Sequence, residues 1–196
     1  MQQLCAVTDF EHAVADFFGA PCAVATDSCT HALELSVRAI QHRTPLTLPR
    51  HTAPSVPMML DKLSITYRLD TIKWRDNYDL VANRVVDAAT SWEAGSYRPG
   101  TLTCISFASG HLSLGRGGMI LLDDEPLSQT LRLMVNDGCD SQGQVQIQGF
   151  HYFMTPLEAQ QGLAMFMHER WRAPRIKDWT CYQDLGLMPY FRRRCS

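Results

Sequence analysis

Lysine is nearly absent from this sequence of 196 residues, which has it only at Lys62, Lys73 and Lys177. An excess of either charge is missing too, since 18 basic and 20 acidic side chains leave a formal net charge of −2. This balance gives no overall field that would attract nucleic acid or an anionic membrane, and the basic C-terminal "FRRRCS" is typical of a solvated tail. No apolar run is long enough to span a bilayer, and the N-terminus lacks the basic and apolar regions of a secretory leader.

The seven cysteines include no C-x-x-C pair. Their odd number and their spacing argue against a disulfide framework and a zinc site, so we expect no metal and a reducing compartment, the cytoplasm. Apolar residues make up 45% of the chain and charged residues 19%, as in a globular domain with a sizeable core. Because no repeat, linker or low-complexity tract divides the chain, we expect one domain over residues 1–196.

Strand and helix patterns alternate along the chain. Strands are expected at 22–26, 44–49 and 64–70, in a segment ending at 87, and at 101–109 and 118–124. Helices are expected from Asp9, a good N-cap, to Gly19, then at 29–40, at 55–63, from about 125, at 155–172 and at 176–185. This alternation predicts a three-layer α/β/α fold with a mostly parallel sheet.

Two strand ends carry side chains suited to a ligand. The strand at 22–26 runs through Ser28 and Thr30 into a helix, and free backbone N–H groups at a helix start attract phosphate. Asp87 ends another strand, at the sheet edge where α/β proteins bind ligands. Each residue also has a plainer interpretation, because hydroxyl and carboxylate side chains commonly cap helices.

The stretch "ISFASGHLSLGRGGMILLDDE" combines two strands with a glycine-rich turn. Gly115, Gly117 and Gly118 could hold a ligand close to the backbone, or simply form a tight hairpin. His111 in this turn is either a surface residue or an acid–base group. Arg116 is either solvated or bound to a carboxylate or phosphate of a substrate.

Four segments, in this order, resemble the DegT/DnrJ/EryC1/StrS sugar aminotransferases, which are pyridoxal-phosphate enzymes of fold type I. They are "FEHAVADFFGAPCAVATDSCTHALELSVRAI", "VVDAATSWEAGSY", "SFASGHLSLGRGGMILLDD" and "GFHYFMTPLEAQQGL". Each match alone is weak, but their order and spacing make the set specific, and it covers most of the chain. The resemblance implies a truncated fold type I large domain.

The resemblance also implies roles for individual residues. The cofactor phosphate would be held by the turn Ser28-Cys29-Thr30 and by Ser106, and Asp87 would pair with the pyridine nitrogen. The family's Schiff-base lysine is missing: its position falls on Gly110 or on His111, depending on the register. An imidazole at His111 can move a proton but cannot hold the cofactor as an imine.

Other positions depart from the family pattern. Ala53 stands where an aromatic residue normally stacks on the cofactor, which leaves His51 as the nearest planar side chain, on the substrate side. His151 and Phe153 replace the family's asparagine and arginine. The βα unit that normally precedes Asp-Ala-Ala is deleted by this comparison, and residues 175–196 resemble a remnant of the link to an absent C-terminal domain. The motifs "TDSCTHA" and "GRGGMI" resemble those of compact phage-encoded relatives. This resemblance would place the protein in a host cytoplasm.

Two hypotheses about function follow. In the first, the chain is a pseudoenzyme with a degenerate site that binds a phosphate-bearing small molecule or a partner, with pyridoxal phosphate bound non-covalently or not at all. In the second, it is a pyridoxal-phosphate-dependent aminotransferase of a sugar nucleotide or modified nucleotide, using an atypical base or a partner's lysine. In both we expect a homodimer or pairing with a related subunit, because the shortened domain should expose apolar surface.

Overall fold

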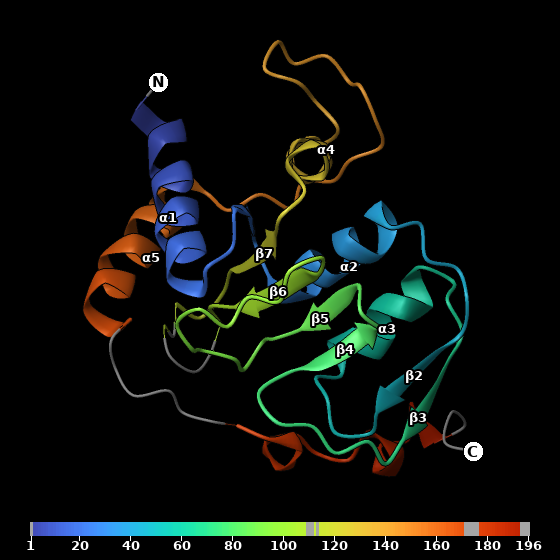
Figure 1. Cartoon of the computed structure of the whole chain (residues 1–196). Helices are drawn as coiled ribbons and strands as arrows, with labels where there is room; N and C mark the ends of the chain where they lie inside the picture. Colours follow the sequence, from blue (N-terminus) through green and yellow to red (C-terminus); the bar gives the residue numbers. More distant parts are fainter. Residues whose placement is uncertain (1, 109–111, 113, 171–176, 193–196) are drawn as a thin grey trace.

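A computed structural model of the chain describes residues 2–108, 112, 114–170 and 177–192. Helices cover both faces of a central sheet, which confirms the expected three-layer α/β arrangement (Figure 1). The helices are α1 (Gln2–Phe18), α2 (Cys29–Ala39), α3 (Ser55–Lys62), α4 (Glu125–Val135) and α5 (Pro156–Glu169). The strands are β1 (Cys22–Thr26), β2 (Leu46–Pro49), β3 (Tyr67–Asp70), β4 (Tyr78–Val81), β5 (Val85–Asp87), β6 (Leu102–Ser106) and β7 (Gly118–Leu122).

The main sheet has five strands in the order β1-β7-β6-β5-β4. Within this sheet, β5 and β6 pair in parallel, whereas β1–β7, β6–β7 and β4–β5 are antiparallel; β2 and β3 form a separate parallel pair. The expectation of a mostly parallel sheet was therefore wrong. Short connections explain the difference: a turn of three residues joins β4 to β5 and the glycine-rich segment joins β6 to β7, and short connections can only join antiparallel neighbours.

The shared direction of strands β1, β5 and β6 positions the candidate site. Strands β1 and β6 both run antiparallel to β7, and β5 runs parallel to β6, so β1, β5 and β6 point the same way. Their carboxyl ends meet at one edge of the sheet, which we call the carboxyl edge. As expected from the sequence, Ser28, Asp87 and Ser106 all belong to this edge.

Alternate side chains of the strands enter two separate cores. Val24 of β1 and Ile120 of β7 pack on the side of α2 and α3, whereas Ala25 and Met119 pack on the side of α1 and α5. Because a strand buried on both faces has no solvent side, β7 is apolar throughout. In the described part of the chain, no helix is both long and apolar enough to cross a membrane.

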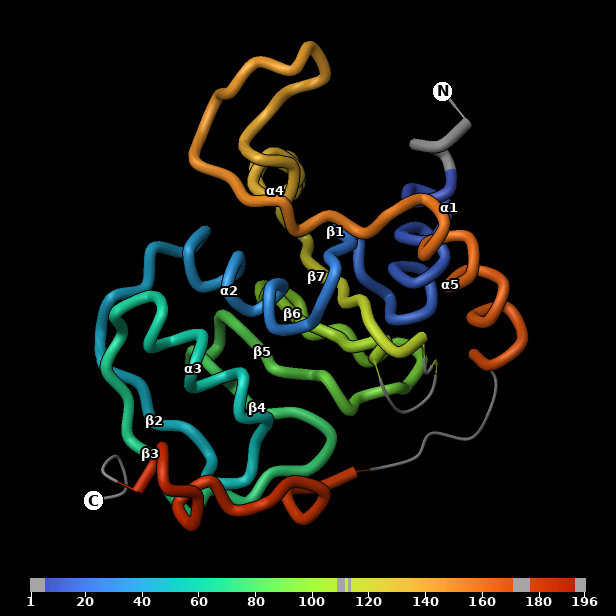
Figure 2. The backbone as a smooth tube through the Cα atoms, turned by 180° about the vertical axis from the view of Figure 1, so that it is seen from behind, coloured from blue at the N-terminus to red at the C-terminus, as the bar shows by residue number. Residues whose placement is uncertain are grey.

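Two regions differ from the sequence expectation. Helix α1 begins at Gln2, so Asp9 lies inside the helix and is not its N-cap, although Gly19 ends the helix with a φ of 77° as expected. Beyond Lys177 there is no long helix among the described residues, but two short 3-10 turns, Trp179–Cys181 and Leu185–Leu187. This C-terminal segment runs along the β2–β3 side of the molecule, opposite α5 (Figure 2).

The glycine turn between β6 and β7 has a structural reason for its composition. A Cβ atom on Gly118 would lie 2.4 Å from the backbone nitrogen of Cys29, so β7 can pass the start of α2 only with glycine there. Gly115 and Gly117 adopt φ values of 78° and 96°, which glycine tolerates best. The turn therefore brings β7 against the helix start, whether or not a ligand binds.

Candidate functional site

The start of α2 carries the hydroxyls that the sequence singled out. Ser28 is the N-cap, and its Oγ accepts a hydrogen bond from the His31 backbone nitrogen at 3.2 Å. The Thr30 hydroxyl donates to the Ser55 hydroxyl at 2.9 Å, and Ser55 is the first residue of α3. Two helix starts thus converge here, and both direct the positive ends of their dipoles to one place.

Asp27, just before this helix, is the negative group nearest to the hydroxyls. Its Oδ1 lies 2.6 Å from Nδ1 of His31. The His31 ring in turn stacks on Tyr152, with ring centroids 3.6 Å apart and planes 5° apart. A protonated His31 would therefore offset the charge of Asp27 beside the helix start.

Asp87 is buried and already has partners for both carboxylate oxygens. Its Oδ2 accepts a hydrogen bond from the Tyr78 hydroxyl at 2.7 Å, and its Oδ1 accepts one from the Ala89 backbone nitrogen at 3.1 Å. Thr52 donates to the Tyr78 oxygen at 2.7 Å and extends the network. Burial raises the pKa of Asp87, and these two donors oppose the shift only in part.

The C-terminal segment covers this carboxylate. Tyr182 borders the space beside Asp87 together with Trp74 and Tyr78, and that space has a volume of only about 10 Å³. Burial, followed by the nearby Asp87 charge, raises the pKa of Tyr182. A volume of this size is at the lower limit for one water molecule. These residues therefore leave no room for an aromatic ring between them and the Asp87 carboxylate.

His51 holds the covering segment in place. Its Nδ1 donates to the carbonyl oxygen of Tyr182 at 2.9 Å, and its ring packs edge-on against Trp179. Next to it, Arg50 forms an ion pair with Asp184 at 2.9 Å. His51 was expected to face a substrate, and its contacts in this structure are with the protein's own C-terminal segment.

The other candidate residues are spread around the carboxyl edge. The Ser106 hydroxyl accepts a hydrogen bond from the Ala108 nitrogen at 3.2 Å, and Cys29 is buried with its thiol facing the Cys104 carbonyl. Arg116 is exposed and forms an ion pair with Glu158 of α5 at 2.8 Å. Gly110 and His111 lie outside the described residues.

Two of the three lysines, Lys62 and Lys73, have partners for their ammonium groups. Lys62 donates to Glu34 at 3.0 Å and to the Tyr152 hydroxyl at 2.6 Å. The Lys73 ammonium lies over the Trp179 ring, 5.6 Å from its centroid. Neither amine contacts Asp87, so these contacts do not supply the missing Schiff-base group.

Sequence reasoning missed Tyr78 and Tyr182. Tyr78 could have been found, because a hairpin centred on the turn at 82–84 places Tyr78 opposite Asp87, as the register of β4 and β5 shows. Tyr182 could not, because it reaches Asp87 only through the fold of a segment without regular periodicity.

A family model for the DegT/DnrJ/EryC1/StrS aminotransferases matches residues 4–54 and 89–188. The chain belongs to this family. Most of the expected motifs lie within the matched ranges, but the unmatched residues 55–88 contain Asp87 and Tyr78. The family's sequence pattern is therefore interrupted where the structure closes off the carboxylate.

Solved structures of aminotransferases are similar in fold. The sugar aminotransferase CalS13 of Micromonospora echinospora gives a TM-score of 0.69 at 20% identity, covering 83% of this chain and 60% of its own. AtS13 of Actinomadura melliaura gives 0.71 at 20% identity, with 83% and 59% covered. PseC of Helicobacter pylori, an aminotransferase in pseudoaminic acid biosynthesis, gives 0.66 at 15% identity, with 86% and 63% covered. This chain thus spans less than two thirds of their length. No curated protein matches it significantly.

Pyridoxal phosphate fits only part of this site. The hydroxyls of Ser28 and Thr30 at the helix start suit its phosphate. Asp87 suits its pyridine nitrogen less well, because Tyr78 and the Ala89 nitrogen already donate to its two oxygens and the space between Asp87 and Tyr182 is too small for a ring. The residues described here therefore fit the phosphate of this group better than its ring.

Proposed function

We propose that this chain is a non-transaminating member of its family that binds a phosphate-bearing small molecule at the start of α2. The observation that carries the proposal is that Asp87 accepts hydrogen bonds from groups within the protein. Its Oδ2 already accepts a hydrogen bond from Tyr78, and the amines of Lys62 and Lys73 have other partners. Without that carboxylate and an amine, a ring cofactor has neither its electron-withdrawing partner nor its covalent anchor.

The phosphate-binding half rests on the convergence of two helix starts. Thr30 and Ser55 place two hydroxyls 2.9 Å apart, at the positive ends of α2 and α3. Each hydroxyl can rotate to donate to an incoming anion. The balancing contact between Asp27 and His31 favours anion binding most when His31 is protonated.

Calorimetric titration with three related compounds tests the proposal. We expect pyridoxal phosphate and pyridoxine phosphate to bind with similar affinity, and pyridoxal without phosphate not to bind. Substituting Thr30→Val should weaken the phosphate compounds about tenfold to a hundredfold, since a hydrogen bond to a charged group contributes roughly 1.5–3 kcal/mol. Thr130→Val, on the exposed face of α4, is the matched control. Equal binding of pyridoxal, or no effect of Thr30→Val, would overturn the phosphate site.

The alternative is a pyridoxal-phosphate-dependent aminotransferase, favoured by the similarity to solved aminotransferases. Borohydride reduction followed by peptide mapping separates the two. A single reduced lysine adduct that disappears in Asp87→Ala would support the alternative. Scattered adducts on surface amines, unaffected by Asp87→Ala, would support a non-transaminating protein.

A further inference from the structure

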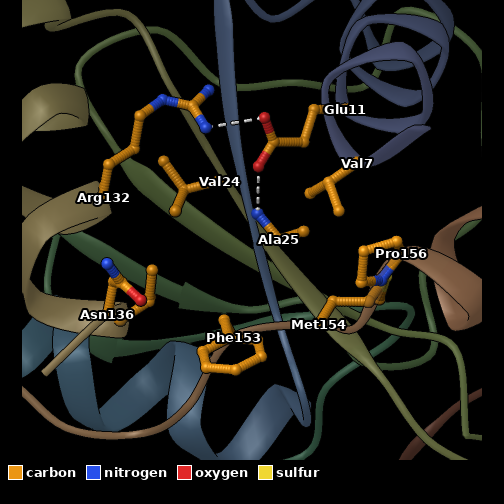
Figure 3. A pocket seen from close by; sticks show the side chains of 10 residues that line it. Val7, Glu11, Val24, Ala25, Arg132, Asn136, Phe153, Met154 and Pro156 are labelled. Atoms are coloured by element: carbon orange, nitrogen blue, oxygen red, sulfur yellow. Dashed lines mark hydrogen bonds and ion pairs between the residues drawn. The ribbon is translucent and has the colours of Figure 1, made fainter. Parts of the chain in front are cut away.

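A second cavity lies away from the carboxyl edge, at the β1 edge of the sheet. It has a volume of about 460 Å³, within the range of small-molecule sites. Strand β1 has a neighbour on one side only, and α1 and α4 project past it from opposite faces. The space between the two helices is closed below by residues 153–156 (Figure 3).

The cavity has one polar wall and an apolar floor (Figure 3). The polar wall consists of Glu11 from α1 and Arg132 from α4, which reach toward each other across β1. The rest is mostly apolar and is lined by Val7, Val24, Ala25, Val135, Phe153, Met154 and Pro156, with Asn136 at one side.

The polar wall is fixed by the unpaired edge of β1. Glu11 Oε1 accepts a hydrogen bond from the Ala25 nitrogen at 2.7 Å, and Arg132 Nη2 donates to the Ala23 carbonyl at 2.9 Å. Glu11 and Arg132 also form an ion pair at 2.7 Å. The guanidinium is therefore held at two points, so little side-chain entropy remains to be lost when it binds a ligand.

Only the positive member of this pair is accessible. The Glu11 side chain is 2% exposed, whereas that of Arg132 is 44% exposed. The Glu11 Oε2 atom is fully buried and forms its ion pair with Nη1 of Arg132. Arg132 has five N–H groups, and its contacts with Ala23 and Glu11 use two of them. Within the described residues, these two contacts leave other N–H groups of Arg132 able to donate to a ligand. Two further titratable groups lie close by, His12 near Glu11 and Glu125 near Arg132.

We propose that this cavity binds a small carboxylate with an apolar body, such as an aryl or branched-chain acid. The carboxylate would pair with the guanidinium of Arg132, whose planar fork matches that group, and the body would fill the apolar floor. A ligand with an ammonium group would instead be repelled by the guanidinium, because the Glu11 carboxylate is buried behind Arg132. The site shares no residue with the carboxyl edge and does not depend on the function proposed there.

Isothermal titration with three probes of equal shape and different charge tests this assignment: phenylbutyrate, its neutral amide and phenylbutylamine. Phenylbutyrate should bind one per chain and at least tenfold more tightly than the amine, with the amide between them. Arg132→Met should remove the preference for phenylbutyrate over the amide. Arg132→Met also removes the hydrogen bond to the β1 edge, so the melting temperature of this variant must be measured. Arg132→Lys keeps the positive charge and should retain part of the preference for phenylbutyrate.

A cavity-filling variant makes the location testable without touching the ion pair. Val7 lies on the half-buried rim, so Val7→Trp should fill the cavity and abolish phenylbutyrate binding while the fold is kept. Val145→Trp, at a residue that is 72% exposed and does not line the cavity, is the matched control and should bind as the wild type does. Equal affinity for acid and amine, unchanged binding in Val7→Trp, or no binding of phenylbutyrate at millimolar concentration would each overturn the proposal.

Discussion

At the scale of single residues, Asp87 is a buried carboxylate whose partners lie within the protein. The carboxylate is still at the end of a sheet strand, as the resemblance implied, but its partners are Tyr78 and a backbone nitrogen. A buried carboxylate is costly unless it accepts hydrogen bonds, so the bond from Tyr78 stabilises the fold at this strand end.

Removing the Tyr78 hydroxyl should therefore destabilise the protein. Tyr78→Phe leaves Oδ2 of Asp87 without its donor, and we expect a loss of roughly 1.5–3 kcal/mol in the free energy of unfolding. Urea denaturation measures it. The control is Tyr190→Phe, because Tyr190 is 58% exposed and its hydroxyl bonds to Asp61 near the surface; its loss should stay below about 0.5 kcal/mol. Equal losses in the two variants would contradict the structural role of Tyr78.

Glu11 should make stability depend on pH. Burial raises its pKa above the ordinary 4.5, although Arg132 and the Ala25 nitrogen oppose the shift. A carboxyl group with a raised pKa contributes stability below its unfolded-state pKa and loses that contribution as the pH rises through the folded-state value. As the pH rises above the ordinary 4.5, the wild type should thus lose stability relative to Glu11→Gln. Unfolding curves of both proteins across this range provide the measurement, and parallel pH profiles would contradict the raised pKa.

At the scale of elements, the caps of α5 show sequence and structure in agreement. Thr155 and Glu158 form a capping box at the helix start, with Pro156 in the first turn. Glu158 also pairs with Arg116 of the glycine-rich segment, so this cap joins α5 to the connection between β6 and β7.

Thr155→Ala should lower the free energy of unfolding by about 1 kcal/mol, because it leaves a backbone N–H at the helix start without its acceptor. Thr130→Ala in α4 is the control: its hydroxyl bonds to the Pro126 carbonyl within the helix, and alanine is the better helix former. Thermal unfolding distinguishes the two. A control as destabilised as Thr155→Ala would mean that the cap adds nothing.

At the scale of the whole molecule, the described surface retains apolar side chains that the fold does not use. On α5, Leu157 is 64% exposed and Met167 is 50% exposed. Their spacing of ten residues places them within about 80° of each other around the helix axis. The sequence expectation is that a second chain covers apolar surface of this protein, and these two side chains are where we place that contact.

We therefore expect a dimer in solution at micromolar concentration. Light scattering should give about twice the chain mass of 22.1 kDa. The double substitution of Leu157→Glu and Met167→Glu should shift the protein to a monomer, because charges in an apolar interface are costly to desolvate. The control replaces two exposed residues away from α5, Val145 and Leu187, with glutamate. A wild-type monomer at this concentration would contradict the expectation.

Much of the fold could be predicted from the sequence, because its signals are local. The buried strand at 22–26, the cap at Ser28 and the capping box at Thr155 each follow from neighbouring residues. The strand directions were predicted less well, since direction depends on which strands are neighbours. The final helix was wrong because the segment after Lys177 is stabilised by contacts with distant residues, such as Arg50 with Asp184, and not by helical periodicity.

The sequence by itself determined the family, the layered architecture and the residues that meet at the carboxyl edge. Strand ends and helix starts are set locally, and the sheet then brings them together. Only the tertiary structure decided what those residues contact. Tyr78 reaches Asp87 across a hairpin, and Tyr182 reaches it from about a hundred residues further along the chain. The cavity at β1 arises in the same way, since Glu11 and Arg132 meet only because α1 and α4 project past the same unpaired strand edge.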